Sequence, residues 1–287
     1  MKFKKKVLKN GLRIISIPNK DSLAATILVL VEAGSKYETK KINGLSHFLE
    51  HMCFKGTINR PRAIDISGAL DSLGAQYNAF TSHEYTGYYA KVEARHFDKT
   101  LNIVADLYQN PLFNEKEIEK EKGVVIEEIN MYEDLPQRKV QDLITELLYG
   151  DQPAGWSIAG DKETIKILNK EDFLKYRGEH YVASATTVVV ACKFDEKKIF
   201  KKVEDQFRAV THGKKFGKIK TDDKQVNPAL LIRHKKSDQT HLVMAFRTCD
   251  TYNKRTYGLE LLAQILGGGM SSRLFQRIRE EMGAAYY

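Results

Sequence analysis

The spacing of hydrophobic and polar residues predicts strands at the start of the chain and helices in its middle. Residues 3–18, FKKKVLKNGLRIISIP, are typical of a hairpin, because Asn10-Gly11 suits a two-residue turn between two strands. Further strands are expected at 24–33, 75–82 and 85–94. Apolar residues three and four apart predict helices at 43–56, 61–73, 96–109, 114–134, 136–149 and 171–181.

The first part of the chain is expected to end with a strand and a helix, and after residue 228 the same order of elements begins again. A strand at 185–193 and a helix ending near residue 209 are followed by a polar segment with two glycines and a proline, which is typical of a linker. Strands at 230–237 and 240–248 and a helix at 254–266 are expected next. Adjacent strands mixed with helices favour an α+β fold over strict βαβ alternation. We therefore predict an N-terminal αβ domain at 1–212, a linker at 213–228 and the beginning of a second, incomplete αβ domain at 229–287.

Composition and charge narrow the possible functions. With 42% hydrophobic residues the chain is expected to fold, and no apolar run approaches the roughly 18 residues of a membrane span. The net charge of +9 includes basic stretches without interleaved aromatic residues, which favours a solvated lysine surface, with an acidic partner as the alternative. Neither nucleic acid nor membrane is predicted as a partner. Cys53, Cys192 and Cys249 are widely spaced, which favours a reducing, cytoplasmic location.

The stretch GLSHFLEHMCFKGT, residues 44–57, carries the most specific chemical signal. On a helix His47 and His51 are one turn apart, so their imidazoles can bind one zinc ion. Glu50 lies just before His51, where it could take a proton from a water that the zinc activates. The pattern HxxEH is an inverted form of the HExxH zinc motif. The alternative is two histidines that only pack in a helix.

A catalytic zinc site usually has three protein ligands, so a third is needed. The helix at 114–134 offers Glu121 and Glu128, which are seven residues apart and share one face. Val124, Val125, Met131 and Tyr132 are assigned to this inward face. Glu127 is assigned to a solvated side, so Glu128 is the preferred ligand. Glu121 is expected either to orient a ligand histidine or to be an exposed helix charge.

These residues resemble the pitrilysin-type inverted-zincin metallopeptidases, and the chain is most similar to bacterial homologues of the mitochondrial processing peptidase β subunit. The family motif is HxxEH followed by about 76 residues and a glutamate, and 76 residues separate His51 from Glu128. The segment EKGVVIEEINMYED resembles the second helix of the family's zinc site. The resemblance places Glu121 at the position of the family's accessory glutamate.

The resemblance also suggests residues that bind substrate. YNAFTSHEYTGYY resembles the family's edge strand, in which Asn78, Ala79 and Phe80 would lie beside an extended peptide. The alternative is an internal hairpin strand. LGGGMSSRLFQRIREEMGAAYY resembles a segment of the family's second domain, so Arg279 would steady substrate and Tyr286 would donate to the oxyanion. Arg279 could instead be a helix-surface charge. The ending AAYY differs from the commoner LAYS-like ending, and family members continue well beyond it, so we expect a fragment.

The resulting functional prediction is a zinc-dependent endopeptidase that hydrolyses peptides or unfolded segments. One zinc ion per chain would be held by His47, His51 and Glu128, although manganese or cobalt could use the same ligands. The resemblance implies a homodimer or a heterodimer with a homologous subunit. The alternative is a non-catalytic homologue that acts as a scaffold or as the partner subunit of a peptidase complex.

Overall fold

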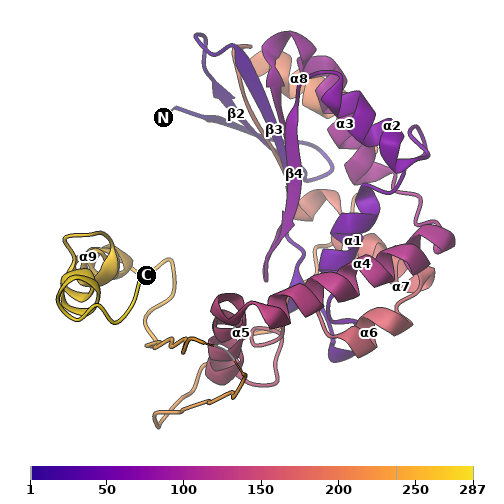
Figure 1. The fold of residues 1–287 in the computed structure, drawn as a ribbon. Helices are drawn as coiled ribbons and strands as arrows, with labels where there is room; N and C mark the ends of the chain where they lie inside the picture. Colours follow the sequence, from indigo (N-terminus) through magenta and orange to yellow (C-terminus); the bar gives the residue numbers. More distant parts are fainter. Residues whose placement is uncertain (1, 237, 287) are drawn as a thin grey trace. The chain divides into compact units, whose positions relative to one another are not determined.

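The computed structural model describes residues 2–236 and 238–286, and these fall into two compact units that divide between Val243 and Met244 (Figure 1). The strands of the first unit are β1 (Lys4–Val7), β2 (Arg13–Pro18), β3 (Ala24–Val31), β4 (Gln76–Thr81), β5 (Thr86–Glu93) and β6 (Thr186–Cys192). Its α-helices are α1 (Leu45–Cys53), α2 (Ala63–Asp71), α3 (Phe97–Gln109), α4 (Glu115–Asp134), α5 (Pro136–Tyr149), α6 (Lys162–Ile167), α7 (Lys170–His180) and α8 (Glu196–Phe207). The predicted α+β fold class is confirmed.

The strands of the first unit form one mixed sheet in the order β1-β2-β6-β3-β5-β4. Only β2 and β6 run parallel to each other, and the other neighbouring pairs are antiparallel. The predicted hairpin at the start of the chain is confirmed as β1 and β2, with Gly11 at φ 92° in the turn. The connection is longer than the two residues predicted, since Val7 pairs with Arg13 and the Leu8 N–H donates to the Leu12 carbonyl at 2.8 Å. The strand β4 pairs only with β5, so it lies at the sheet edge.

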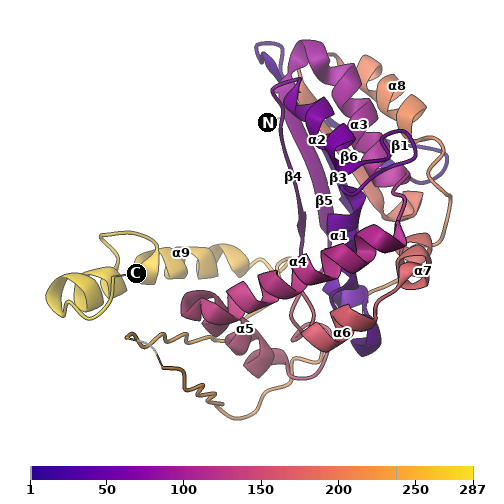
Figure 2. The same cartoon turned by 45° about the vertical axis from the view of Figure 1, so that its right-hand side comes forward.

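Helices cover one face of the sheet, where α2, α3 and α8 lie side by side (Figure 2). The geometry of β3 explains this arrangement, because every second side chain of a strand points to the same face, here toward the helices. Ala25, Ile27, Val29 and Val31 are fully buried, whereas the intervening residues are half-buried. The core of this unit therefore lies between the sheet and its helical layer.

The helix α1 begins at an internal cap. Glu38 is fully buried, and its carboxylate accepts hydrogen bonds from the Ser46 backbone N–H at 2.6 Å and the Gly44 backbone N–H at 2.9 Å. These backbone groups have no partner within the helix, and an anion at a helix N-terminus is favourable. Phe48 then packs edge-on against Phe173 of α7, with 5.0 Å between ring centroids. The start and the middle of α1 are thus fixed in the core.

A second buried carboxylate holds the segment that follows α1. Asp106 on α3 accepts hydrogen bonds from the side chains of Thr57, Asn59, Arg60 and Asn110, at 2.5 to 2.9 Å. Burial alone would raise the pKa of Asp106, but the hydrogen bonds from Thr57, Asn110, Asn59 and Arg60 outweigh it and lower that pKa. This network fixes the segment after α1 against α3.

The second unit contains α9 (Thr256–Gly267) and a π-helical segment, Phe275–Glu281. The helix predicted at 254–266 is therefore confirmed. The strands predicted at 230–237 and 240–248 are wrong, since described residues 211–255 contain no strand; Ser237 lies outside the described residues. Their apolar side chains, such as Leu230 and Phe246, are largely exposed. A strand needs a hydrogen-bonding neighbour, and none is paired with these segments.

Residues 283–286 are not in a strand, and Tyr287 lies outside the described residues. The short helix α6, capped by Asp161, was not predicted because its six residues give too short a periodic pattern. The domain boundaries at 212 and 228 stay a prediction. Within residues 2–236 and 238–286, no helix combines the length and apolar character needed to cross a membrane.

Candidate metal centre

The helix α1 presents two different faces. Leu45, Phe48, Leu49 and Met52 are buried in the core. His47, Glu50 and His51 share the other side and are half-buried. The ring centroids of the two histidines are 4.7 Å apart, as expected for residues one turn apart. The sequence therefore places chemically active side chains on the one face of α1 that the core does not take up.

The helix α4 brings Glu128 to these histidines. Glu127 is exposed and accepts a hydrogen bond from Asn130 at 3.2 Å. The inward face is narrower than the sequence predicted, because Val124 and Met131 are about half exposed. At 3.6 residues per turn the stripe that faces α1 is Glu121, Val125, Glu128 and Tyr132, and the two exposed residues fall outside it.

The three candidate ligands converge with the spacing of a zinc site. Oε2 of Glu128 is 3.6 Å from Nε2 of His47 and 3.5 Å from Nε2 of His51. All three ligand atoms lie within 4.8 Å of one another. Two ligands about 2.1 Å from a tetrahedral zinc ion are about 3.4 Å apart, so these atoms could hold one ion with little movement. The donor set of two imidazoles and one carboxylate also suits zinc.

Glu121 supports the second histidine. It is 4% exposed, and its Oε1 lies 2.9 Å from Nδ1 of His51. Its Oε2 lies 2.5 Å from the Lys55 ammonium. Burial would raise the pKa of Glu121, but His51 and Lys55 outweigh it and lower that pKa. Burial would likewise lower the pKa of His51, yet Glu121 and Glu128 raise it.

Glu50 sits between α1 and the sheet edge. Its Oε2 accepts a hydrogen bond of 2.5 Å from Oγ1 of Thr81, the last residue of β4. Burial raises the pKa of Glu50, and the bond from Thr81 offsets only part of that effect. The predicted substrate residues Asn78, Ala79 and Phe80 lie on the same edge strand.

The other two candidate ligands, Glu128 and His47, differ in their hydrogen-bond partners. The Tyr132 hydroxyl donates to Oε1 of Glu128 at 2.5 Å, and this bond with burial raises the pKa of Tyr132 to about 12. Burial, and then the neighbouring His51, lower the pKa of His47 to about 4. Among the described residues, no hydrogen-bond partner meets the buried Nδ1 of His47. A neutral imidazole is the form that binds metal.

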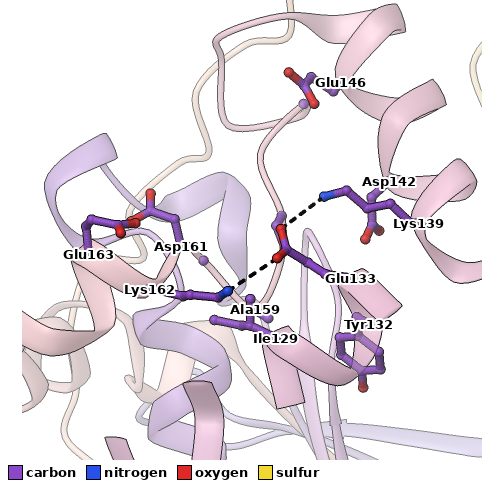
Figure 3. Close-up of a pocket in the computed structure, with 13 residues that line it drawn as sticks. Ile129, Tyr132, Glu133, Lys139, Asp142, Glu146, Ala159, Asp161, Lys162 and Glu163 are labelled. Atoms are coloured by element: carbon purple, nitrogen blue, oxygen red, sulfur yellow. Dashed lines mark hydrogen bonds and ion pairs between the residues drawn. The ribbon is translucent and has the colours of Figure 1, made fainter. Parts of the chain in front are cut away.

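A pocket of about 410 Å³ adjoins this centre, between α4, α5 and the segment 155–163 (Figure 3). Tyr132 belongs both to this pocket and to the metal centre. Glu133 lies between two lysines and pairs with Lys162 at 3.3 Å and with Lys139 at 3.7 Å (Figure 3). The wall at residues 155–163 also contacts the start of α1, since the Ser157 carbonyl accepts from Asn43 at 3.0 Å.

The predicted residues Arg279 and Tyr286 lie in the second unit. The Arg279 guanidinium stacks over the Tyr286 ring, 4.5 Å from its centroid, and over Phe275 at 4.7 Å. Tyr286 is 78% exposed. The two residues therefore contact each other, and their role toward substrate stays a prediction.

Comparison with known proteins gives the family. Residues 13–162 match the family described as Insulinase (Peptidase family M16), and this range contains His47, His51, Glu121 and Glu128. The chain belongs to peptidase family M16. Residues 168–287 match the description Peptidase M16 inactive domain. The candidate metal ligands of this M16 chain thus all lie in the first matched range.

Relatives of this M16 chain carry the description "uncharacterized zinc protease". YmxG of Bacillus subtilis is 40% identical over 285 residues, covering 99% of this chain and 68% of the relative. A protein of Rickettsia bellii is 40% identical over 287 residues, covering 97% and 67%. The chain therefore spans about two thirds of the length of these relatives.

Solved structures support the fold of the M16 chain. A protease from Helicobacter pylori superimposes with a TM-score of 0.84 at 23% identity, covering 98% of this chain and 69% of that one. A peptidase M16 inactive domain from Pseudomonas fluorescens gives a TM-score of 0.82 at 15% identity, covering 98% and 68%. At these identities the likeness concerns the fold alone.

Sequence reasoning gave no role to three residues around the candidate metal centre, although it assigned Tyr132 to the inward face of α4. Lys55, Thr81 and Tyr132 each contact one of its carboxylates, on Glu121, Glu50 and Glu128 respectively. Only Tyr132 carried a signal, since it lies four residues after Glu128 on one helix. Lys55 and Thr81 reach their partners across tertiary contacts, which no spacing within a helix could reveal.

Proposed function

We propose that this chain is a zinc-dependent endopeptidase whose metal is held by His47, His51 and Glu128. The observation that carries the proposal is the convergence of two Nε2 atoms on one carboxylate oxygen at 3.5 and 3.6 Å. Family membership and the zinc proteases among its relatives support the choice of metal. Zinc bound there would activate water and polarise a scissile carbonyl.

Glu50 is the proposed general base. It shares the half-buried side of α1 with both histidines, but it is not among the three converging ligands. Its carboxylate would take a proton from the attacking water and pass it to the leaving amine. Burial, which raises the pKa of Glu50, makes the carboxylate a better proton acceptor than an exposed glutamate.

The edge strand β4 is the proposed binding site for the peptide. Because β4 pairs only with β5, its other side offers backbone groups to an added strand. Thr81 ends this strand and touches Glu50, so a peptide beside Asn78, Ala79 and Phe80 would lead toward the base. An extended peptide or unfolded segment therefore fits better than a folded protein. Assembly with a homologous chain stays a prediction.

Two substitutions separate metal binding from proton transfer. Glu50→Gln should retain zinc and lower the cleavage rate of an unstructured peptide by about 10²- to 10⁴-fold. His51→Ala should lose the zinc itself. Glu127→Gln is the matched control, because Glu127 is exposed and should leave both properties unchanged. Zinc content by elemental analysis and cleavage by mass spectrometry give the two readouts. An unchanged cleavage rate in zinc-loaded Glu50→Gln would refute the role of Glu50.

A non-catalytic scaffold is the second candidate. This scaffold function is considered because residues 168–287 match the description Peptidase M16 inactive domain. That range contains none of His47, Glu50, His51 and Glu128. If the zinc-loaded chain binds the peptide but does not cleave it, the scaffold function is the better account.

A further inference from the structure

Lys55 has a defined place at the metal centre but no assigned role. It lies two residues beyond the end of α1, and its side chain is 29% exposed. Its ammonium is 2.5 Å from Oε2 of Glu121, whose other oxygen is 2.9 Å from Nδ1 of His51. Lys55, Glu121 and His51 thus form a continuous chain that ends at a candidate zinc ligand.

We propose that Lys55 is a positioning residue for the metal site, which it serves by fixing the Glu121 carboxylate against His51. The inference rests on the proposed zinc site. A ligand histidine binds through one ring nitrogen, and its orientation is set by the bond that the other nitrogen makes. Here Glu121 accepts from Nδ1, which leaves Nε2 on the side of Glu128, where it could bind the proposed metal.

The burial of Glu121 explains why the lysine is needed. At 4% exposure, an ionised oxygen without a partner would carry a large desolvation cost. Lys55 supplies the partner of Oε2, so both carboxylate oxygens are held at once. Without the ammonium, the carboxylate would gain by turning toward water, and His51 would lose its orienting contact.

The positive charge of Lys55 has an effect on zinc binding that opposes its positioning role. The ammonium is a cation close to a site for another cation, so its removal could tighten zinc binding by relieving repulsion. The negative Glu121 carboxylate contacts the ammonium directly, and the two charges largely cancel at the metal. Loss of the orientation should therefore dominate, and the two effects predict opposite changes in affinity.

The zinc dissociation constant of the 287-residue chain, measured by competition with a chelator, tests the inference. Lys55→Met should weaken zinc binding about tenfold, at the low end of the 10- to 100-fold typical of residues that support metal ligands. Lys55→Arg should restore most of the affinity. Lys120→Met is the matched control, because Lys120 forms an ion pair with Glu117 at 2.8 Å on the exposed side of α4.

A double variant separates positioning from a loss of folding. If Lys55 acts through Glu121, then adding Lys55→Met to Glu121→Gln should change the zinc affinity by less than twofold. No unpaired charge remains in that double variant, so the comparison survives even if Lys55→Met alone destabilises the fold. Thermal melting of each zinc-free protein reports folding independently.

The outcomes are distinct. Equal or tighter zinc binding by Lys55→Met, or an equally large loss in the Glu121→Gln background, would overturn the role of Lys55 while leaving the zinc site intact. Failure of the unsubstituted chain to bind zinc would overturn the site and this inference together. Weaker binding that depends on Glu121 and returns with arginine supports it.

Discussion

Thr81→Val is the sharpest test of how the proposed base is held. Thr81 ends β4, and its hydroxyl donates to Oε2 of Glu50 at 2.5 Å. Valine has nearly the same shape and also suits a strand, so the substitution only replaces the hydroxyl by a methyl group. The edge strand that would bind substrate should remain, whereas Glu50 should lose the contact that fixes its carboxylate.

The size of the effect follows from the type of bond. A hydrogen bond to a charged group contributes about 1.5–3 kcal/mol, and each 1.4 kcal/mol corresponds to a tenfold change in rate, which gives a limit of roughly 10- to 150-fold. Glu50 keeps part of its orientation from the rigid helix α1, whose neighbouring residues are buried. We therefore expect kcat to fall about tenfold.

The assay must distinguish the base from the binding strand. With an unstructured peptide and zinc-loaded protein, Thr81→Val should lower kcat and leave KM and zinc content unchanged. Thr81→Ser keeps a hydroxyl and should recover most of the rate. An unchanged kcat, or a higher KM with the same kcat, would show that Thr81 serves substrate binding or nothing at all.

Three further predictions follow from other contacts. The pKa of Asp106 is lowered in the folded state, so its contribution to stability is complete above about pH 4 and is lost as the pH falls through the folded value. Urea unfolding should show Asp106→Asn less stable than the unsubstituted protein at pH 6, with a difference in unfolding free energy that narrows as the pH falls below about 4; a difference independent of pH contradicts this. Tyr132→Phe removes the 2.5 Å bond to Glu128 and should weaken zinc binding about tenfold, as measured by competition with a chelator. An unchanged zinc affinity would show that this bond does not support the metal site. Phe173→Ala, in the fully buried contact with Phe48, should lower the free energy of unfolding by about 3–5 kcal/mol, and a loss below about 1 kcal/mol would contradict it.

The local pattern predicted most of the first unit for a physical reason. The strand β3 alternates between buried and half-buried residues, and α3 and α4 carry long periodic faces. The period within each element therefore indicates its type and its buried side. The segments at 230–237 and 240–248 show the limit of this reasoning. Their residues suit strands, but a strand exists only where a partner offers hydrogen bonds, and that partner is not specified locally.

The residues of the candidate site likewise divide into those that local spacing identifies and those that it does not. His47, Glu50 and His51 were found because their spacing on one helix is itself the signal. Glu128 was preferred over Glu127 by helical periodicity, and the structure brings Glu128 to both histidines. Val124 and Met131 were assigned to that face wrongly, since an apolar side chain at the edge of a helical stripe can remain exposed.

The contacts around the site explain how three carboxylates can lie near one another in a half-buried place. Each has its own donor from outside the ligand set: Tyr132 for Glu128, Lys55 for Glu121 and Thr81 for Glu50. Because unpaired buried charges are costly, these donors hold the carboxylates in place before any metal binds. One donor lies on α4, one just beyond α1 and one at the end of β4, so the site depends on the packing of three elements rather than on α1 alone. A helix with the HxxEH pattern in another fold would present two histidines, but it would lack the supports that make them a preorganised metal site.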